Sequence, residues 1–239
     1  MQSKGIAIIT GASKGIGYCL SNGLAADGYR VVLIARDKER LQTITEEISS
    51  MVLIELKPEY LSLDVTNYKE VAEVIDHFAK EPEQIAILVN NAGMWLDGTL
   101  DESPQNFATL LDTNVVSPFV FMKKVGEAMK KNGKGHIFNI ASRAGVYGFP
   151  GCGLYSASKF ALVGLSESLY REFADCGVKV TAICPGWVNT EMAKAANTPF
   201  QDHEMIQPSD ILNSIKYVLG LSESTCIREL VIECSKSVL

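Results

Sequence analysis

The sequence predicts an α/β domain in which helices cover both faces of a doubly wound parallel sheet, and three observations support this prediction. Short apolar runs rich in β-branched residues alternate with amphipathic helical patterns along almost the whole chain. These runs contain few polar residues, which indicates strands buried on both faces. A glycine-rich segment directly follows the first apolar run. Alternation of strands and helices is typical of a parallel sheet with right-handed crossovers.

These patterns place each element along the chain. Strands are expected at residues 5–9, 31–35, 60–63, 85–89, 135–140, 178–183 and 229–232. Helices are expected at residues 18–26, 37–50, 67–79, 103–131, 154–176 and 208–219. Asn67 is suited to cap the helix that begins beside it. Residues 51–56 fit either a continuation of the preceding helix or a small edge strand, and the pattern favours neither.

Composition limits the classes of function open to this chain. Its 239 residues are 47% hydrophobic with a formal net charge of -6, which suits a single domain over residues 1–239 and argues against electrostatic binding of nucleic acid. No apolar run is long enough to span a membrane, and the first strand begins too early to leave room for a signal peptide. We therefore expect a cytoplasmic protein. The 6 cysteines and 3 histidines show no metal-ligand spacing, so we expect no metal site.

The segment from Thr10 to Gly17 joins the first strand to the first helix. Such an arrangement points the unpaired N–H groups of the helix N-terminus into the loop, where a phosphate group binds readily. Glycines allow the tight turn and the close approach of phosphate to the backbone. The Gly-x-x-x-Gly-x-Gly spacing differs from the common Gly-x-Gly-x-x-Gly dinucleotide fingerprint. By itself the segment is also compatible with a tight turn that binds no ligand.

The residues at the ends of the other strands are polar or conformationally special. Ligands of parallel sheets bind beyond the carboxyl ends of the strands. The residues at these ends are Ala35, Arg36, Asp64, Val65, Asn90, Asn91, Ala92, Gly93, Ala141, Ser142, Cys184, Pro185 and Gly186. This distribution predicts a binding site along the carboxyl edge of the sheet.

Tyr155 and Lys159 are four residues apart at the start of a long predicted helix and therefore share one face. A lysine ammonium beside a phenol favours the phenolate, so we expect Lys159 to lower the pKa of Tyr155 towards neutrality. Such a phenol can exchange a proton with an alcohol oxygen. Ser142, at the adjoining strand end, is placed to donate a hydrogen bond to a carbonyl oxygen. The alternatives are a surface Tyr–Lys pair and a serine that only caps a turn.

Taken together, these motifs resemble the short-chain dehydrogenase/reductase family over essentially the whole chain. The matching positions are Thr10, Gly11, Gly15, Ile16, Gly17, Asn90, Asn91, Ala92, Gly93, Asn114, Ser142, Tyr155, Lys159, Pro185 and Gly186. The resemblance implies a Rossmann-like domain with a seven-stranded sheet in the order 3-2-1-4-5-6-7. It also implies an oxidoreductase that transfers hydride between a nicotinamide cofactor and a carbonyl or alcohol group.

The resemblance further implies roles for individual residues. Tyr155 would be the general acid of reduction, Lys159 would hold the nicotinamide ribose and lower the pKa of Tyr155, and Ser142 would bind the substrate carbonyl. Asn114 would interrupt its helix and hold a water molecule that relays protons to Lys159. Asp64 would contact the adenine. The cofactor-binding set implied is Gly11, Ser13, Lys14, Gly15, Ile16, Gly17, Arg36, Asp64, Val65, Asn91, Ala92, Gly93, Tyr155, Lys159, Pro185, Gly186, Val188 and Thr190, the last four around the nicotinamide.

We expect NADP(H) to be preferred over NAD(H). NAD-selective sheets usually place Asp or Glu at the end of the second strand, where it holds the ribose 2′-OH. Here Ala35 ends that strand and Arg36 follows. Arg36 and Lys14 can converge on a 2′-phosphate, with Ser13 adding hydrogen bonds. The alternative is that Arg36 faces solvent and Asp37 lies near the ribose instead.

The expected substrate is a ketone or aldehyde, aromatic or of medium size and apolar, or the corresponding alcohol, bound at Ser142 and Tyr155. Candidate pocket residues are Trp95, Val146, Tyr147, Phe149, Leu154, Trp187, Met192 and Phe200. Any one of these side chains can instead pack in the core or in a covering segment. Residues 191–206, in the part of the chain that sets substrate choice in the family, are of mixed character.

Two other functions stay open. Reduction of a 3-oxoacyl group on a carrier protein is disfavoured by the tail, because many such reductases carry Asp-Gly-Gly after the last strand and this chain does not. A docking patch for an acidic carrier would need cations, for which the candidates are Lys123, Lys124, Lys130, Lys131 and Lys134. A protein that senses NADP(H) without catalysis would not need Tyr155 and Lys159, both of which are present.

A homodimer or homotetramer is expected from the two long helices. Relatives pair such helices across a two-fold axis. The apolar residues Phe160, Val163, Leu165 and Leu169 exceed what one sheet-facing stripe requires.

Overall fold

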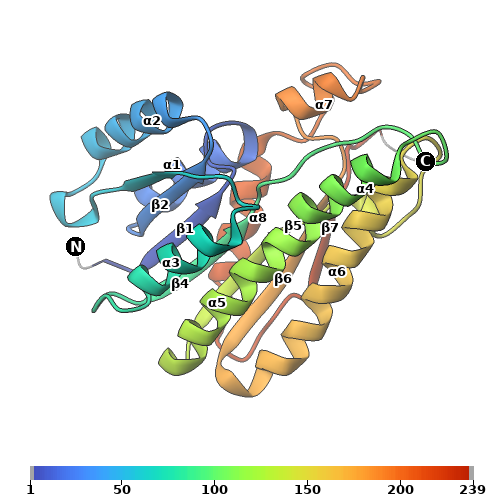
Figure 1. Ribbon diagram of the computed structural model, residues 1–239. Coiled ribbons are helices and arrows are strands. Elements are labelled where there is room, and N and C mark those ends of the chain that lie inside the picture. Colours follow the sequence, from blue (N-terminus) through green and yellow to red (C-terminus); the bar gives the residue numbers. More distant parts are fainter. Residues whose placement is uncertain (1–2, 237–239) are drawn as a thin grey trace.

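Seven parallel strands form one sheet in the order β3-β2-β1-β4-β5-β6-β7, as predicted. The computed structural model describes residues 3–236 (Figure 1). The strands are β1 (Ile6–Thr10), β2 (Arg30–Ala35), β3 (Glu59–Ser62), β4 (Ile85–Asn90), β5 (Gly135–Ile140), β6 (Val178–Pro185) and β7 (Glu229–Ile232). The strand order reverses between β1 and β4, which is where a ligand crevice forms in sheets of this kind.

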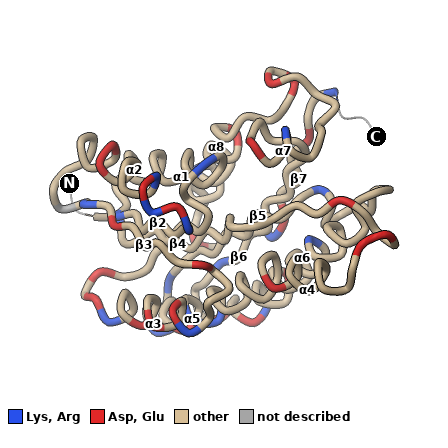
Figure 2. Tube along the Cα trace, turned by 45° about the horizontal axis from the view of Figure 1, so that its top comes forward, with Lys and Arg blue, Asp and Glu red and all other residues tan. Residues whose placement is uncertain are grey.

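Helices connect the strands and pack on both faces of the sheet. The helices are α1 (Gly15–Ala26), α2 (Lys38–Met51), α3 (Tyr68–Phe78), α4 (Pro104–Leu111), α5 (Ser117–Asn132), α6 (Gly153–Phe173), α7 (Glu191–Ala195) and α8 (Pro208–Leu219). Shorter turns are η1 (Ile54–Leu56), η2 (Asp112–Val116), η3 (Arg143–Gly145) and η4 (Ala174–Cys176). Helices α1, α2 and α8 cover one face and α3, α5 and α6 cover the other (Figure 2).

Alternation along the strands divides the core into these two layers. In β1, Ile6 and Ile8 pack with α3, α5 and α6, whereas Ala7 and Ile9 pack with α1, α2 and α8. All of these side chains are fully buried. Because successive strand residues point to opposite faces, a strand that is apolar at every position serves both layers.

The structure differs from the predictions in three places. The pattern predicted one continuous helix over residues 103–131, whereas the structure divides it at the π-helical turn η2, where the family resemblance implied an interruption at Asn114, and α7 was not predicted. Residues 51–56 match neither expectation, because α2 ends at Met51 and Ile54–Leu56 form a 3-10 turn. Pro58 disfavours helix at the residue before it, and the edge strand begins only after it, at Glu59.

His136 is a buried titratable group in β5, an inner strand of the sheet. Its Nε2 lies 2.8 Å from Thr181 Oγ1, and that hydroxyl donates to Ile227 O at 2.6 Å. The hydroxyl hydrogen is therefore engaged, and the neutral ring donates from Nε2. Burial lowers the pKa of His136 to about 3.

Acid should destabilise the fold through His136. An unfolded histidine binds a proton below about pH 6.5, whereas the folded ring stays neutral to about pH 3, so stability falls as pH drops through this window by about 1.4 kcal/mol per unit. Denaturant unfolding of wild type and His136→Gln at pH 7, 6 and 5 measures this slope. The glutamine amide can still donate to Thr181, so the variant should lose the part of the slope that His136 contributes, and its slope should be smaller than that of the wild type; identical slopes would contradict the prediction.

Candidate active site

A cavity of about 1350 Å³ follows the carboxyl ends of the strands. It exceeds the roughly 300–1,000 Å³ of pockets for drug-sized ligands, so it has room for a large ligand and a second, smaller one. The predicted site residues that line it are Gly11, Ser13, Lys14, Gly15, Ile16, Arg36, Asp64, Val65, Asn91, Ala92, Gly93, Ser142, Tyr155, Lys159, Pro185, Gly186, Val188 and Thr190. Gly17 and Asn114 are absent from the lining and lie behind it.

The glycine loop leaves the N-terminus of α1 open to the cavity. Gly11 and Gly15 have φ angles of 64° and 54°, a backbone conformation that favours glycine. A side chain at Gly17 would clash with the Gly11 carbonyl oxygen, so this glycine permits close packing of α1 rather than ligand contact. No acidic side chain occupies the first turn of α1, and no side chain caps it. The helix N-terminus therefore suits an anion.

Asn91 and Thr10 hold the loop against the end of β4. Asn91 Nδ2 donates to the carbonyl oxygens of Thr10 and Gly11 at 3.0 and 3.1 Å. Thr10 Oγ1 accepts from the backbone N–H groups of Asn91 and Ala92, both at 3.0 Å. These bonds fix the glycine loop at the point where the strand order reverses.

Ser142, Tyr155 and Lys159 meet beyond the end of β5. The Ser142 side chain lies close enough to Tyr155 to lower the pKa of the phenol, which opposes the effect of burial. Ser142 also caps the turn η3 by accepting from Ala144 N at 3.1 Å, which is the capping role considered for it, and it lines the cavity. Lys159 Nζ donates to Ile140 O at 2.9 Å and lies 5.6 Å from the centre of the Tyr155 ring. All three residues face the same part of the cavity.

The expected lowering of the pKa of Tyr155 is wrong for this structure. Burial raises the pKa of Tyr155 to about 12, although the hydrogen bond from Ser142 opposes this shift. Burial also lowers the pKa of Lys159 to about 8. The four-residue spacing correctly predicted that the two residues lie together, but desolvation by burial is the largest cause of both pKa shifts, and the Lys159 ammonium donates to Ile140 O.

Asn114 lies in the π-helical turn η2. This turn interrupts the helix at the position that the family resemblance implied. Its Oδ1 accepts from Met94 N at 2.9 Å, and its Nδ2 donates to Met94 O at 2.9 Å and to Ser158 Oγ at 3.1 Å. A Cβ atom on Gly93 would lie 3.3 Å from Asn114 Oδ1 and 3.8 Å from Lys159 Nζ. The π turn thus brings Asn114 close to Lys159, behind Gly93.

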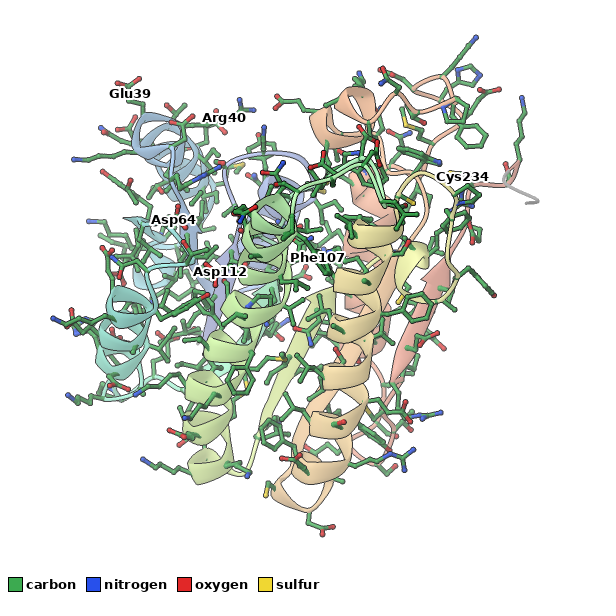
Figure 3. All side chains as sticks on the ribbon, turned by 45° about the vertical axis from the view of Figure 1, so that its right-hand side comes forward. Glu39, Arg40, Asp64, Phe107, Asp112 and Cys234 are labelled. Atoms are coloured by element: carbon green, nitrogen blue, oxygen red, sulfur yellow. The ribbon has the colours of Figure 1, made fainter. Side chains whose placement is uncertain are left out.

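Charged side chains border the cavity near β2 and β3. Arg36 Nη1 lies 3.9 Å from Asp64 Oδ2, and Asp64 Oδ1 accepts from Thr66 N at 2.9 Å. Asp37 caps α2 through Oδ1, which accepts from Arg40 N at 3.0 Å, and Asp37 also lines the cavity, as the alternative considered for it requires. Figure 3 shows Arg40 on α2 and Asp64 on the same side of the molecule.

An aromatic wall borders the opposite end of the cavity. The Trp95 ring lies 4.5 Å from the Tyr155 ring and 6.2 Å from that of Trp187, and Phe149 and Met192 also line this end. Of the pocket residues predicted, Val146, Tyr147, Leu154 and Phe200 do not line the cavity. Tyr147 is 57% exposed. The sequence showed that these four side chains are mostly apolar, but it did not show whether they point into the cavity.

Arg40, Arg143 and Glu191 line the cavity and were not predicted. Arg143 lies 4.8 Å over the Phe149 ring and 3.0 Å from Glu233 Oε2, which follows β7. The sequence could have indicated that Arg143 lines the cavity, because it directly follows the predicted site residue Ser142. Arg40 and Glu191 reach the cavity only because α2 and α7 begin at its border.

Known proteins are similar to this chain in fold and in sequence. The family model described as short chain dehydrogenase matches residues 5–200. The chain belongs to the short-chain dehydrogenase family. An uncharacterised oxidoreductase of Staphylococcus saprophyticus is 32% identical over 97% of both chains. A crystal structure of a β-ketoacyl-[ACP] reductase from Bacteroides thetaiotaomicron is 47% identical, with a TM-score of 0.87 over 99% of both chains. A structure of ElxO with NADP bound is 28% identical, with a TM-score of 0.85 over 98% of this chain and 97% of that one.

This short-chain dehydrogenase is therefore an oxidoreductase with a Rossmann-like fold. Its residues fit a nicotinamide dinucleotide, because the α1 N-terminus is open and the loop glycines leave no side chain over it. Within residues 3–236, no helix is long and apolar enough to cross a bilayer. The same residues contain no group of three or more His, Cys, Asp or Glu that could hold a metal ion.

Proposed function

We propose that this protein reduces a ketone or aldehyde with NADPH, and oxidises the alcohol in the reverse direction. The observation that carries the proposal is that Ser142, Tyr155 and Lys159 meet in the cavity lining, with Ser142 close enough to Tyr155 to affect its pKa. A carbonyl oxygen placed between the two hydroxyl groups would accept from both. Negative charge that develops on this oxygen during reduction would be stabilised by these donors.

Each residue has a defined part in the proposed reaction. The nicotinamide supplies the hydride when bound. Tyr155 donates the proton to the carbonyl oxygen, and its raised pKa keeps the phenol protonated at neutral pH, as an acid requires. Ser142 holds the same oxygen. Lys159 would hold the ribose hydroxyls, and Asn114, close to Lys159 behind Gly93, would connect Lys159 to solvent through a water molecule.

The proposed cofactor-binding residues form groups along the cavity, each of which would hold a different part of the cofactor. The glycine loop and the α1 N-terminus would hold the pyrophosphate. Lys14, Ser13 and Arg36 would bind a 2′-phosphate, and Asp64 with Val65 would contact the adenine ring. Asn91, Ala92 and Gly93 would support the adenosine side. Residues around the nicotinamide would be Pro185, Gly186, Val188 and Thr190.

Reduction of a 3-oxoacyl group on a carrier protein is the second candidate. It is favoured by the 47% identity to the β-ketoacyl-[ACP] reductase structure. The lysines considered as a docking patch argue less strongly for it. Lys130, Lys131 and Lys134 lie near the start of β5, at the sheet edge opposite the cavity, and Lys124 pairs with Asp76 at 3.0 Å.

A panel of carbonyl substrates, followed by NADPH absorbance, tests the proposal. Turnover of small ketones or aldehydes would support it, and turnover only of acetoacetyl groups on an acyl carrier would favour the second candidate. Tight NADPH binding without turnover of any carbonyl compound would indicate a cofactor-sensing protein and contradict both.

We also propose that the protein forms a homodimer or homotetramer in a cytoplasmic setting. Helices α5 and α6 lie side by side in Figures 1 and 3, and Phe119 on α5 and Phe160 on α6 are exposed. An exposed apolar surface of this kind is typical of an interface. Light scattering at micromolar concentration should give a multiple of 26.0 kDa; a single species of that mass would contradict the proposal.

A further inference from the structure

One ion pair joins the glycine loop to helix α7 across the cavity border. Lys14 Nζ lies 2.6 Å from Glu191 Oε2. Lys14 directly precedes α1, and Glu191 is the first residue of α7. The side chains are 59% and 62% exposed, so the pair contributes little to folding stability. In the free protein, however, the carboxylate of Glu191 neutralises the charge of Lys14.

Both proposed phosphate-binding cations face a carboxylate in this structure. Arg36 lies 3.9 Å from Asp64, whereas the pair between Lys14 and Glu191 is much closer. The hydrogen bond and charge of Lys14 hold the pKa of Glu191 below its usual value, and Arg40 acts in the same direction. Acidic and basic residues accordingly gather around the starts of α1, α2 and α7 in Figure 2. Glu191 is thus ionised and close to the proposed phosphate site.

We propose that Glu191 sets the degree of preference between NADPH and NADH by competing with the 2′-phosphate for Lys14. This inference rests on the proposed function of the cavity. A 2′-phosphate would have to displace Glu191 from Lys14 before Lys14 could bind it. NADH has no such group and leaves the pair unchanged. Removal of the charge at Glu191 should therefore strengthen binding of NADPH alone.

The variant Glu191→Gln tests this competition, and Asp202→Asn is its matched control. Asp202 pairs with Lys194 of α7 at 2.8 Å, and its side chain is as exposed as that of Glu191. Both substitutions remove one negative charge from the same part of the surface. Dissociation constants for NADPH and NADH are measured by calorimetry without substrate, at low and at physiological ionic strength.

Glu191→Gln should bind NADPH about two- to fivefold more tightly at low salt, as expected for one exposed ion pair, and NADH with unchanged affinity. The gain should decrease with added salt because exposed charges are screened. Asp202→Asn should leave both affinities unchanged. Equal gains for NADPH and NADH in Glu191→Gln, or an equal gain for NADPH in Asp202→Asn, would overturn the proposal.

A double-mutant cycle with Lys14→Ala shows whether Glu191 acts through Lys14. In the Lys14→Ala background, Glu191→Gln should no longer change NADPH affinity. An undiminished effect there would mean that Glu191 acts on the phosphate directly or through Arg40, and would overturn the proposal. Wild-type protein that binds NADPH and NADH equally would contradict only the proposed cofactor preference, because the comparison of Glu191→Gln with Asp202→Asn still decides the role of Glu191.

Discussion

Tyr155→Phe should abolish turnover while cofactor binding stays nearly unchanged. The substitution removes only the hydroxyl, which lies beside Ser142 in the cavity lining. The ring should remain buried against Trp95, whose ring lies 4.5 Å away, so the fold should not change. Loss of a general acid lowers the rate by about 10²–10⁴. The measurements are kcat/KM on the best carbonyl substrate and the dissociation constant of NADPH.

Two variants give this experiment its controls. Tyr147→Phe removes a hydroxyl from an exposed tyrosine outside the cavity lining and should retain full activity. Lys159→Ala should damage both turnover and cofactor binding, because the proposed role of Lys159 joins ribose binding to proton transfer. If Tyr155→Phe keeps more than a few per cent of wild-type activity, Tyr155 is not the acid.

Local signals in the sequence were sufficient to predict the bounds of elements that begin or end at proline or glycine. Helix α8 has the predicted bounds because Pro208 suits the first helical position and Gly220 directly follows the last. Strand β5 also has the predicted bounds, since Gly133 ends α5 in a left-handed conformation just before it. The strand order, in contrast, came from the family resemblance, because apolar runs carry no information on which strands pair.

Features that depend on tertiary contacts were not predictable from pattern. Helix α7 is a single short turn, too short to show periodicity. The π turn at Asn114 is stabilised by bonds to Met94 and Ser158, which are distant in sequence. The direction of the Tyr155 pKa shift required knowledge of burial. The spacing of Tyr155 and Lys159 predicted proximity but not the desolvation that opposes it.

NADPH should be preferred over NADH, and Arg36→Asp should reverse or remove this preference. The second strand ends at Ala35, so no carboxylate stands at the strand end that usually holds a ribose 2′-OH, and Oδ1 of Asp37, two residues later, caps α2. Two hydrogen-bonded cations could each contribute about 1.5–3 kcal/mol to phosphate binding. Because the Arg36 side chain is 82% exposed, solvent should reduce the preference to about ten- to several-hundredfold.

The measurements are kcat/KM for NADPH and NADH on wild type, Lys14→Ala and Arg36→Asp, each at two salt concentrations. Lys38→Ala is the control, because Lys38 begins α2 beside the cavity but does not line it. Lys14→Ala should lose part of the preference, and added salt should weaken the preference of the wild type. An aspartate at position 36 supplies the acceptor that a 2′-OH needs and repels a 2′-phosphate. Equal values for both cofactors in the wild type would refute the preference, and an Arg36→Asp variant that still favours NADPH would show that Arg36 does not bind the phosphate.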